Sequence, residues 1–293
     1  MDQVNRRAPA FLLPLIALLA AMACFQLGAS FAKGLFPAVG PEGAATLRIG
    51  LAAVMLLAVA RPWRDWPKQA PLLPLLGLGL SSAGAMVMFY KAISHLPQGV
   101  AIALQFLGPL SIAVLGSRRH RDLAWAVLAA AGVWALVGHG AGSRPLDLVG
   151  VAWALGAAAA WAGYILWGRA AGATFGKSAA ALATTVAAVL VLPVGVAHAG
   201  LALLSPGLIP LALAVALFST AVPFSLELYA MPRLPARTFS VFTSLEPALG
   251  ALSGFVLLHE ALSLSQLAGL AAVIAAAAGA AWSTTREAAP ALS

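Results

Sequence analysis

Long apolar runs, separated by short polar gaps, occupy nearly the whole chain. A helix needs about 20 apolar residues to cross the hydrocarbon core of a bilayer. Short gaps between the runs leave no room for a separate catalytic domain. The pattern therefore predicts an all-α integral membrane protein with ten transmembrane helices. The predicted spans cover residues 11–32, 43–60, 71–90, 97–116, 122–139, 149–167, 178–198, 208–229, 236–257 and 262–283.

The composition agrees with this class. Hydrophobic residues make up 62% of the 293 residues and charged residues only 9%, whereas soluble domains carry about 25% charged residues. The net charge of +8 would suggest nucleic acid in a soluble protein, but here the basic residues lie in the gaps, where they set topology. We therefore expect a lipid bilayer around the chain and no nucleic-acid partner. The single cysteine, Cys24, excludes a disulfide framework.

The distribution of Lys and Arg predicts the orientation. Most of these residues fall in the gaps that share one side if the N-terminus is cytoplasmic. By the positive-inside rule, both termini are then expected in the cytoplasm. The expected location is a bacterial inner membrane. Cys24 ends a stretch that resembles a cleaved leader, but the apolar run continues through Phe31, so we expect the first helix to be retained.

The chain also repeats itself. A shift of 138 residues places Leu96-Pro97 on Leu234-Pro235, Pro109 on Pro247 and Gly116 on Gly254. This predicts two five-helix repeats, at 11–139 and 149–283. Because five is odd, the second repeat must cross in the opposite sense, which is an inverted repeat typical of secondary transporters. A duplicated membrane scaffold with another function is the alternative.

Glu246 is the clearest candidate for chemistry, because a charge inside a membrane is costly. It is predicted about 15 Å along the ninth helix, directly before Pro247, and a proline frees a backbone carbonyl. The equivalent place in the first repeat holds Pro109, close to Gln105. Two broken helices facing each other would place a carboxylate, an amide and free carbonyls around one cavity. The alternative is that both prolines only kink helices and Glu246 binds a neighbouring helix.

Three cations, Lys33, Arg48 and Lys91, map near the outer ends of the first three helices, against the positive-inside rule. Arg48 is the best candidate of the three, because it lies within a span and not at its edge. One interpretation is a cationic vestibule that attracts a substrate carboxylate, with Arg48 and Lys33 as donors. The other is that these side chains snorkel and pair with Glu42 and water.

Other polar side chains are weaker candidates for the pathway, each with a structural alternative. Gln26 and Ser30 are four apart on one helix face, and hydrogen bonding between helices would also explain Gln26. A salt bridge to nearby arginines would explain Glu227. Ser219, Thr220 and Ser244 are expected to bond their own helix backbones. The pathway candidates of this group are Gln26, Ser30, Tyr90, Tyr164 and Glu227.

Enzyme motifs are absent from the sequence. His259-Glu260 lacks a second His at zinc-helix spacing, and there is no P-loop or Gly-x-Ser-x-Gly. We therefore expect no enzyme activity, no metal site and no cofactor.

Several stretches resemble the drug/metabolite transporter superfamily and its EamA-type pair of domains. The resemblance covers residues 8–285. Within this superfamily, the motifs are similar to those of bacterial inner-membrane exporters of threonine and homoserine. The stretches that carry it are Phe25–Phe36, Leu104–Pro109, Pro223–Leu228, Leu234–Phe239 and Ser244–Leu249.

The resemblance implies export of small neutral amino acids by alternating access, driven by the proton gradient as in an antiporter. Its partners would be a small polar substrate and a proton, with Glu246 as the titrating group. One departure is Gln105, where a Glu is expected. The alternative is the same fold exporting other metabolites or lipophilic cations, which should dispense with Arg48. The sequence leaves the oligomeric state, the exact substrate and the coupling ion open.

Overall fold

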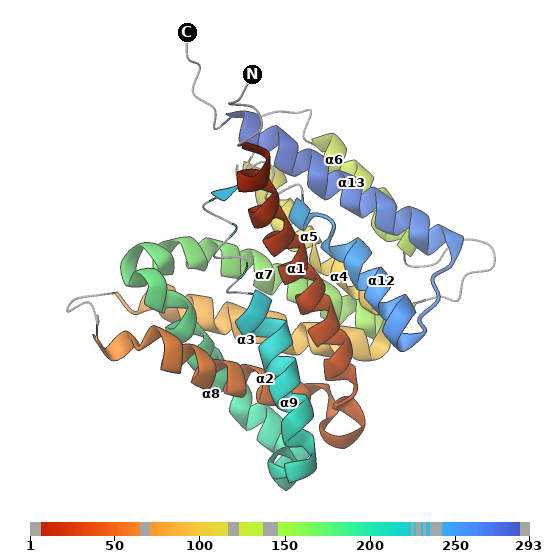
Figure 1. Cartoon of the computed structure of the whole chain (residues 1–293). Coiled ribbons are helices and arrows are strands. Elements are labelled where there is room, and N and C mark those ends of the chain that lie inside the picture. The colour runs from red at the N-terminus through yellow and green to blue at the C-terminus, as the bar shows by residue number, and fades with distance from the viewer. Residues whose placement is uncertain are drawn as a thin grey trace.

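The computed structural model describes residues 7–64, 71–116, 123–136, 146–223 and 242–287, with positions 226, 230, 233 and 234. Within these ranges the chain is helical throughout, with short turns and without strands (Figure 1). The helices of the first half are α1 (Arg7–Lys33), α2 (Phe36–Ala60), α3 (Leu73–His95), α4 (Gln98–Gln105), α5 (Leu107–Gly116) and α6 (Leu123–Leu136).

The second half begins with the longest helix. Its helices are α7 (Leu148–Phe175), α8 (Ala179–Ala199), α9 (Ile209–Ala216), the π-helix η6 (Leu217–Ala221), α12 (Glu246–Leu258) and α13 (Leu264–Glu287). Single 3-10 turns η1 (Pro62–Arg64), η3 (Gly176–Ser178), η4 (Gly200–Leu204) and η5 (Pro206–Leu208) lie between helices.

Five helices of the described part, α1, α2, α3, α7 and α8, are long and apolar enough to cross a membrane. Shorter apolar helices occupy the other five regions in which spans are predicted from the sequence. Large apolar side chains cover the outside; Val59 and Leu115, for example, are each 84% exposed. Such an exterior suits lipid, which demands no polar groups on a protein surface.

The span predicted over 97–116 is broken near Pro109, as the sequence predicts. The interruption lies at Phe106, in a turn between α4 and α5. Pro109 explains the position, because it lacks the N–H that would bond to the carbonyl four residues earlier, that of Gln105. The flanking bonds persist, from the Phe106 amide to Ile102 and from the Leu110 amide to Phe106.

Two spans of the second half differ from the prediction. The span predicted over 208–229 changes from α-helix to π-helix at Leu217. In the span predicted over 236–257, a turn at Ser244 and Leu245 separates the helical residues 242 and 243 from α12, which begins at Glu246. Pro247 therefore lies in the first turn of α12, where a missing N–H costs nothing.

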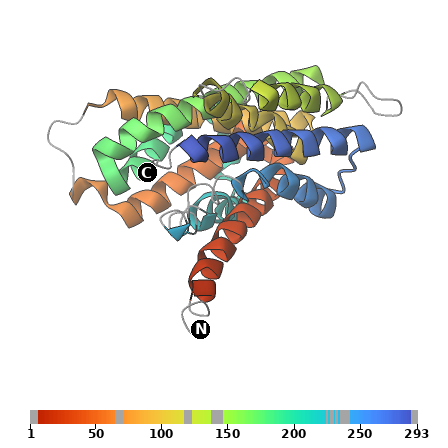
Figure 2. The same cartoon turned by 90° about the horizontal axis from the view of Figure 1, so that it is seen from above.

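The most extensive helix contacts join the two halves. α3 packs along α7, α2 along α8, α6 along α13 and α4 along α12, and Figure 1 shows α6 beside α13. α1 contacts α12, α9 and η6. Its N-terminal part projects from the body formed by the other helices (Figure 2), and Leu12, Leu13 and Ile16 there are more than half exposed.

Close approach between halves depends on small residues. A Cβ built on Gly99 of α4 would lie 2.5 Å from the Cβ of Ala251 in α12. A Cβ built on Gly108 of α5 would lie 2.2 Å from the Ala158 carbonyl oxygen in α7. Larger side chains at these two positions would push the halves apart, as at other small-residue contacts between membrane helices.

Candidate functional site

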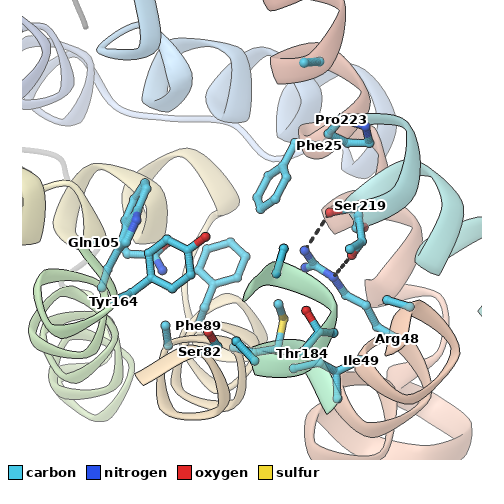
Figure 3. A pocket seen from close by; sticks show the side chains of 18 of the residues that line it. Phe25, Arg48, Ile49, Ser82, Phe89, Gln105, Tyr164, Thr184, Ser219 and Pro223 are labelled. Carbon is cyan, nitrogen blue, oxygen red and sulfur yellow. Dashed lines mark hydrogen bonds between the residues drawn. The ribbon is translucent and has the colours of Figure 1, made fainter. Parts of the chain in front are cut away.

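A cavity of about 320 Å³ lies where α1, α2, α3, α4, α7, α8, η6 and the start of α12 meet (Figure 3). This volume is at the small end of the range for ligand pockets, about 300–1,000 Å³. Much of the wall is apolar, with Phe25, Phe89 and Trp161 among the lining rings. The polar and charged lining residues are Gln26, Arg48, Ser82, Gln105, Tyr164, Thr184, Ser219, Thr220 and Glu246.

Arg48 is the best-defined charged group of the cavity. Only 2% of it is exposed. Its Nη2 donates to the Ser219 carbonyl at 2.8 Å, its Nη1 to the Tyr90 hydroxyl at 3.3 Å and its Nε to the Thr220 hydroxyl at 3.4 Å. Its Cζ lies 5.1 Å from the centre of the Phe25 ring and 5.6 Å from that of Tyr90, within the range of cation–π attraction.

Arg48 lies within α2, as the span predicted over 43–60 indicates, and not at the edge of the helix. α2 is kinked at Gly40, which takes a non-helical conformation with φ 68°, and helical segments lie on both sides of it. The segment that follows the kink carries Arg48 to the cavity.

The carbonyl that binds Arg48 is available because of Pro223. In an α-helix the Ser219 carbonyl would accept from residue 223, and proline has no N–H to donate. The chain forms the π-helix η6 here, with the Val222 amide bonded to Leu217. π-Helical turns are common at functional sites. In this chain the turn presents a main-chain oxygen to a buried guanidinium.

The hydroxyls of Ser219 and Thr220 were expected to bond their own helix backbone, and both differ from this. The Thr220 hydroxyl accepts from Arg48, whereas the Ser219 hydroxyl is buried without a partner among the described residues, and it is the Ser219 carbonyl that accepts from Arg48. One signal was present in the sequence, because a proline four residues after Ser219 frees its carbonyl. Nothing in the sequence alone indicated that α2 would supply the donor.

Glu246 and Gln105 line the same cavity as Arg48. Each lies at a helix interruption, Gln105 at the end of α4 and Glu246 at the start of α12. Pro109 and Pro247 follow them. Figure 3 shows Gln105 and Tyr164 across the cavity from Arg48. The structure thus brings a carboxylate, an amide and a guanidinium to one cavity.

Lys33 and Lys91 lie elsewhere, at helix ends. The Lys33 ammonium pairs with Glu260, in the segment after α12. The Lys91 ammonium lies 2.8 Å from a carboxylate oxygen of Glu42 and 4.5 Å from the centre of the Trp153 ring. Neither lysine lines the cavity. These contacts favour the ion-pair interpretation for both lysines.

Of the remaining candidates, Gln26 and Tyr164 line the cavity, whereas Ser30 and Tyr90 lie behind its wall. The Ser30 hydroxyl bonds to Gln98 at 2.9 Å and lies 2.7 Å from that of Ser253, which ties α1 to α4 and α12. Tyr90 is fully buried beneath Arg48.

Glu227 lies outside the described residues. Within the residues that the structure covers, no group of three His, Cys, Asp or Glu side chains is placed to hold a metal ion.

A helical, lipid-compatible body around a central cavity with fixed polar groups defines a multi-pass membrane transport protein. The chain belongs to the EamA-like transporter family, whose model matches residues 12–138 and 148–282. The two matches leave only short segments outside the family model.

Several known proteins are similar over most of their length. The threonine/homoserine exporter RhtA of Salmonella typhimurium is 46% identical over 287 residues, 98% of this chain and 97% of that protein. RhtA of Escherichia coli K12 is 46% identical over 96% of this chain and 95% of its own length. The uncharacterized transporter YwfM of Bacillus subtilis is 29% identical over 81% of this chain and 85% of its own.

A solved crystal structure of a protein with 21% sequence identity shares the fold. It superposes with a TM-score of 0.59 and covers 96% of this chain and 99% of its own.

Proposed function

We propose that this protein exports small neutral amino acids, of the threonine and homoserine class, across a bacterial inner membrane. The observation that carries the proposal is one small cavity that presents both Arg48 and Glu246. A zwitterion needs a donor for its carboxylate and an acceptor for its ammonium, and these two side chains supply both. The relatives named as threonine/homoserine exporters support the substrate class.

Arg48 also separates this function from the alternative of the same fold exporting lipophilic cations. A buried guanidinium repels a cation, and at short range this repulsion is strong in a low dielectric. A cation exporter gains nothing from an arginine in the middle of its cavity. The amino-acid function uses the charge, because a carboxylate forms paired, charge-assisted hydrogen bonds with a guanidinium.

Glu246 is our candidate for proton coupling. A proton and a substrate ammonium would each neutralise the same carboxylate, so they compete for it. Competition for one site is what exchange of a proton for a substrate requires. Gln105 carries no charge and cannot share this role, which leaves Glu246 as the acid at the helix interruptions.

Alternating access by two inverted repeats is supported by the pairing of helices. The second predicted span packs on the seventh (α2 on α8), the fourth on the ninth (α4 on α12) and the fifth on the tenth (α6 on α13). The first contacts the eighth (α1 with α9 and η6), and the third packs on the sixth (α3 on α7). A two-fold axis relating the repeats would produce this pattern, with the cavity near the axis.

The proposed orientation places both termini in the cytoplasm. The first turn of α1 and the last turn of α13 lie at the same end of the molecule (Figure 1). Reporter fusions after residues 66, 120, 174 and 233 should read cytoplasmic, and fusions after 40, 95, 143 and 204 external. A consistent reversal would overturn the orientation, and a mixed pattern would overturn the ten-span topology.

The function is tested in inverted membrane vesicles, where export appears as uptake into the lumen. Labelled threonine and homoserine should accumulate when the lumen is acidified, and the accumulation should collapse when a protonophore is added. A panel of other amino acids and a lipophilic cationic dye is measured in parallel. Uptake of the dye without uptake of any amino acid would establish the alternative.

A further inference from the structure

We propose that Pro223, the Ser219 carbonyl and the Thr220 hydroxyl form a mount for Arg48, which leaves one N–H on each Nη atom to receive a substrate carboxylate end-on. The proposal rests on the proposed function, in which Arg48 binds that carboxylate. It makes Thr220 and Pro223 positioning residues, which act on the substrate through Arg48.

The number of N–H donors on Arg48, and the partners that they have, lead to this geometry. A guanidinium has five N–H groups in a rigid plane. Three are engaged, one on Nε by Thr220, one on Nη2 by the Ser219 carbonyl and one on Nη1 by Tyr90. Among the described residues, these contacts leave one N–H on each Nη. A carboxylate can accept a pair of N–H groups from one guanidinium, and the two Nη atoms supply such a pair.

Consecutive residues hold the guanidinium along one edge. The Ser219 carbonyl binds Nη2 at 2.8 Å and the Thr220 hydroxyl binds Nε at 3.4 Å. No amide of residue 223 competes for this carbonyl, because proline has no N–H. A mount made partly of main chain cannot swing aside as a long side chain can.

The π-helix is itself held by α1. A Cβ built on Gly28 would lie 2.6 Å from the Ser219 amide nitrogen and 2.9 Å from its Cα. Glycine at this position therefore lets the two backbones touch. η6 has no room to shift toward α1, and the carbonyl stays in register with Arg48.

The rings of Phe25 and Tyr90 also restrain the guanidinium, and neither ring carries a negative charge that would neutralise it. Both lie within cation–π range of the guanidinium. The partners of Arg48 in the described part of the chain are neutral oxygens and aromatic rings, with no carboxylate among them. Its positive charge is therefore oriented by the fold but left for a ligand.

The test compares Thr220→Val, which loses the hydroxyl but keeps the shape, with Thr220→Ser, which keeps the hydroxyl. A charge-assisted bond of this kind is worth about a tenfold change in affinity. We expect Thr220→Val to raise the KM for homoserine uptake about tenfold with Vmax within about twofold, and Thr220→Ser to restore most of the affinity. Thr185→Val is the matched control, because that hydroxyl bonds only its own helix, at 2.8 Å from Ala181.

Pro223→Ala is the second variant. It restores an N–H that competes with Arg48 for the Ser219 carbonyl, so we expect a similar rise in KM. A further readout uses threoninamide, which lacks the carboxylate, as a competitor. The mount variants should reduce the preference for threonine over threoninamide about tenfold, whereas a general structural defect would weaken both ligands alike.

The outcomes distinguish the two proposals. An unchanged KM in both Thr220→Val and Pro223→Ala, with normal wild-type transport, would overturn the mount and leave the function standing. Equal loss of threonine and threoninamide binding would also overturn the mount. Failure of the wild-type protein to transport or bind any amino acid would overturn both.

Discussion

Three cations that look alike in the sequence differ in their surroundings. Lys33 and Lys91, at helix ends, each contact a carboxylate, Glu260 and Glu42 respectively. Arg48, at the cavity, contacts neutral oxygens and aromatic rings in the described part of the chain. The fold neutralises the first two charges and only orients the third. A cation that breaks the positive-inside rule is therefore informative about ligands only after its partners are known.

The carboxylates at the helix ends, Glu260 and Glu42, each contact two partners. Glu260 pairs with Lys33 and accepts the Gln98 amide at 2.7 Å, at the start of α4. Glu42 lies 2.8 Å from the Lys91 ammonium and 3.6 Å from His198 of α8. Each carboxylate thus ties several helix ends together, which is a structural use of charge.

The largest expected effect is at Arg48. Arg48→Ala should lower homoserine and threonine export by about 100-fold or more, because the substrate carboxylate loses a paired, charge-assisted contact. Arg48→Lys should recover only part of this, since a lysine cannot form the fork. Uptake at matched protein levels in vesicles measures both. Wild-type rates in Arg48→Ala would remove the distinction between this cation and the other two.

The next effect concerns Glu246. Glu246→Gln should abolish the response of uptake to a pH gradient, because an amide cannot bind and release a proton. The protein should still insert and fold, since glutamine keeps the size of the side chain. Uptake with and without an imposed gradient gives the answer. An undiminished pH response in the variant would assign the coupling to another residue.

Breaking an ion pair at the helix ends should act on stability instead of transport. We expect Glu260→Gln to reduce the free energy of unfolding by about 1–3 kcal/mol, the usual range for a damaging substitution, with the KM for homoserine within about twofold of wild type. Thermal unfolding in detergent and vesicle uptake measure the two quantities. The control is Lys33→Met, which breaks the same pair and leaves the bond from the Gln98 amide to Glu260 in place, and should lower the free energy of unfolding to a similar extent. A large rise in KM would place Lys33 on the substrate pathway after all.

The smallest effect is expected at Asp147, outside the membrane-spanning segment. Bonding of its carboxylate by the Val149 amide at 2.8 Å and by His95 at 2.7 Å lowers the pKa of Asp147. The carboxylate therefore stabilises the fold above its unfolded pKa, about 3.9, and the contribution is lost as the pH falls through the lower folded value. Asp147→Ala should lower the Tm slightly at pH 7. The difference in Tm from the wild type should shrink as the pH falls below the folded pKa of Asp147, and a deficit that does not change with pH would exclude this linkage.

Hydrophobic periodicity predicts the class of the protein, because lipid imposes long apolar runs on any helix that crosses it. It also led to Glu246 and Gln105, since an acid and an amide beside prolines inside such runs are unusual. The periodicity did not predict the π-helix or the partners of Arg48. Those depend on which donor from one helix meets a free carbonyl of another, and no single span contains that information.

Lys33 is a second residue whose partner the sequence does not reveal. Its partner Glu260 follows α12, more than 200 residues later, so the pair exists only once the first and last helices have assembled. A sequence can show that a charge needs compensation, but the compensating group is chosen by tertiary packing.

The packing of helices across the two halves has a consequence for how the protein is made. α2 and α3 find their most extensive partners in α8 and α7, which are synthesised later. The first half therefore enters the bilayer with its main packing faces still in lipid, and its helices can only settle when the second half arrives. The two halves resemble each other in sequence, but the helices of the first half are fully packed only when the second half is present.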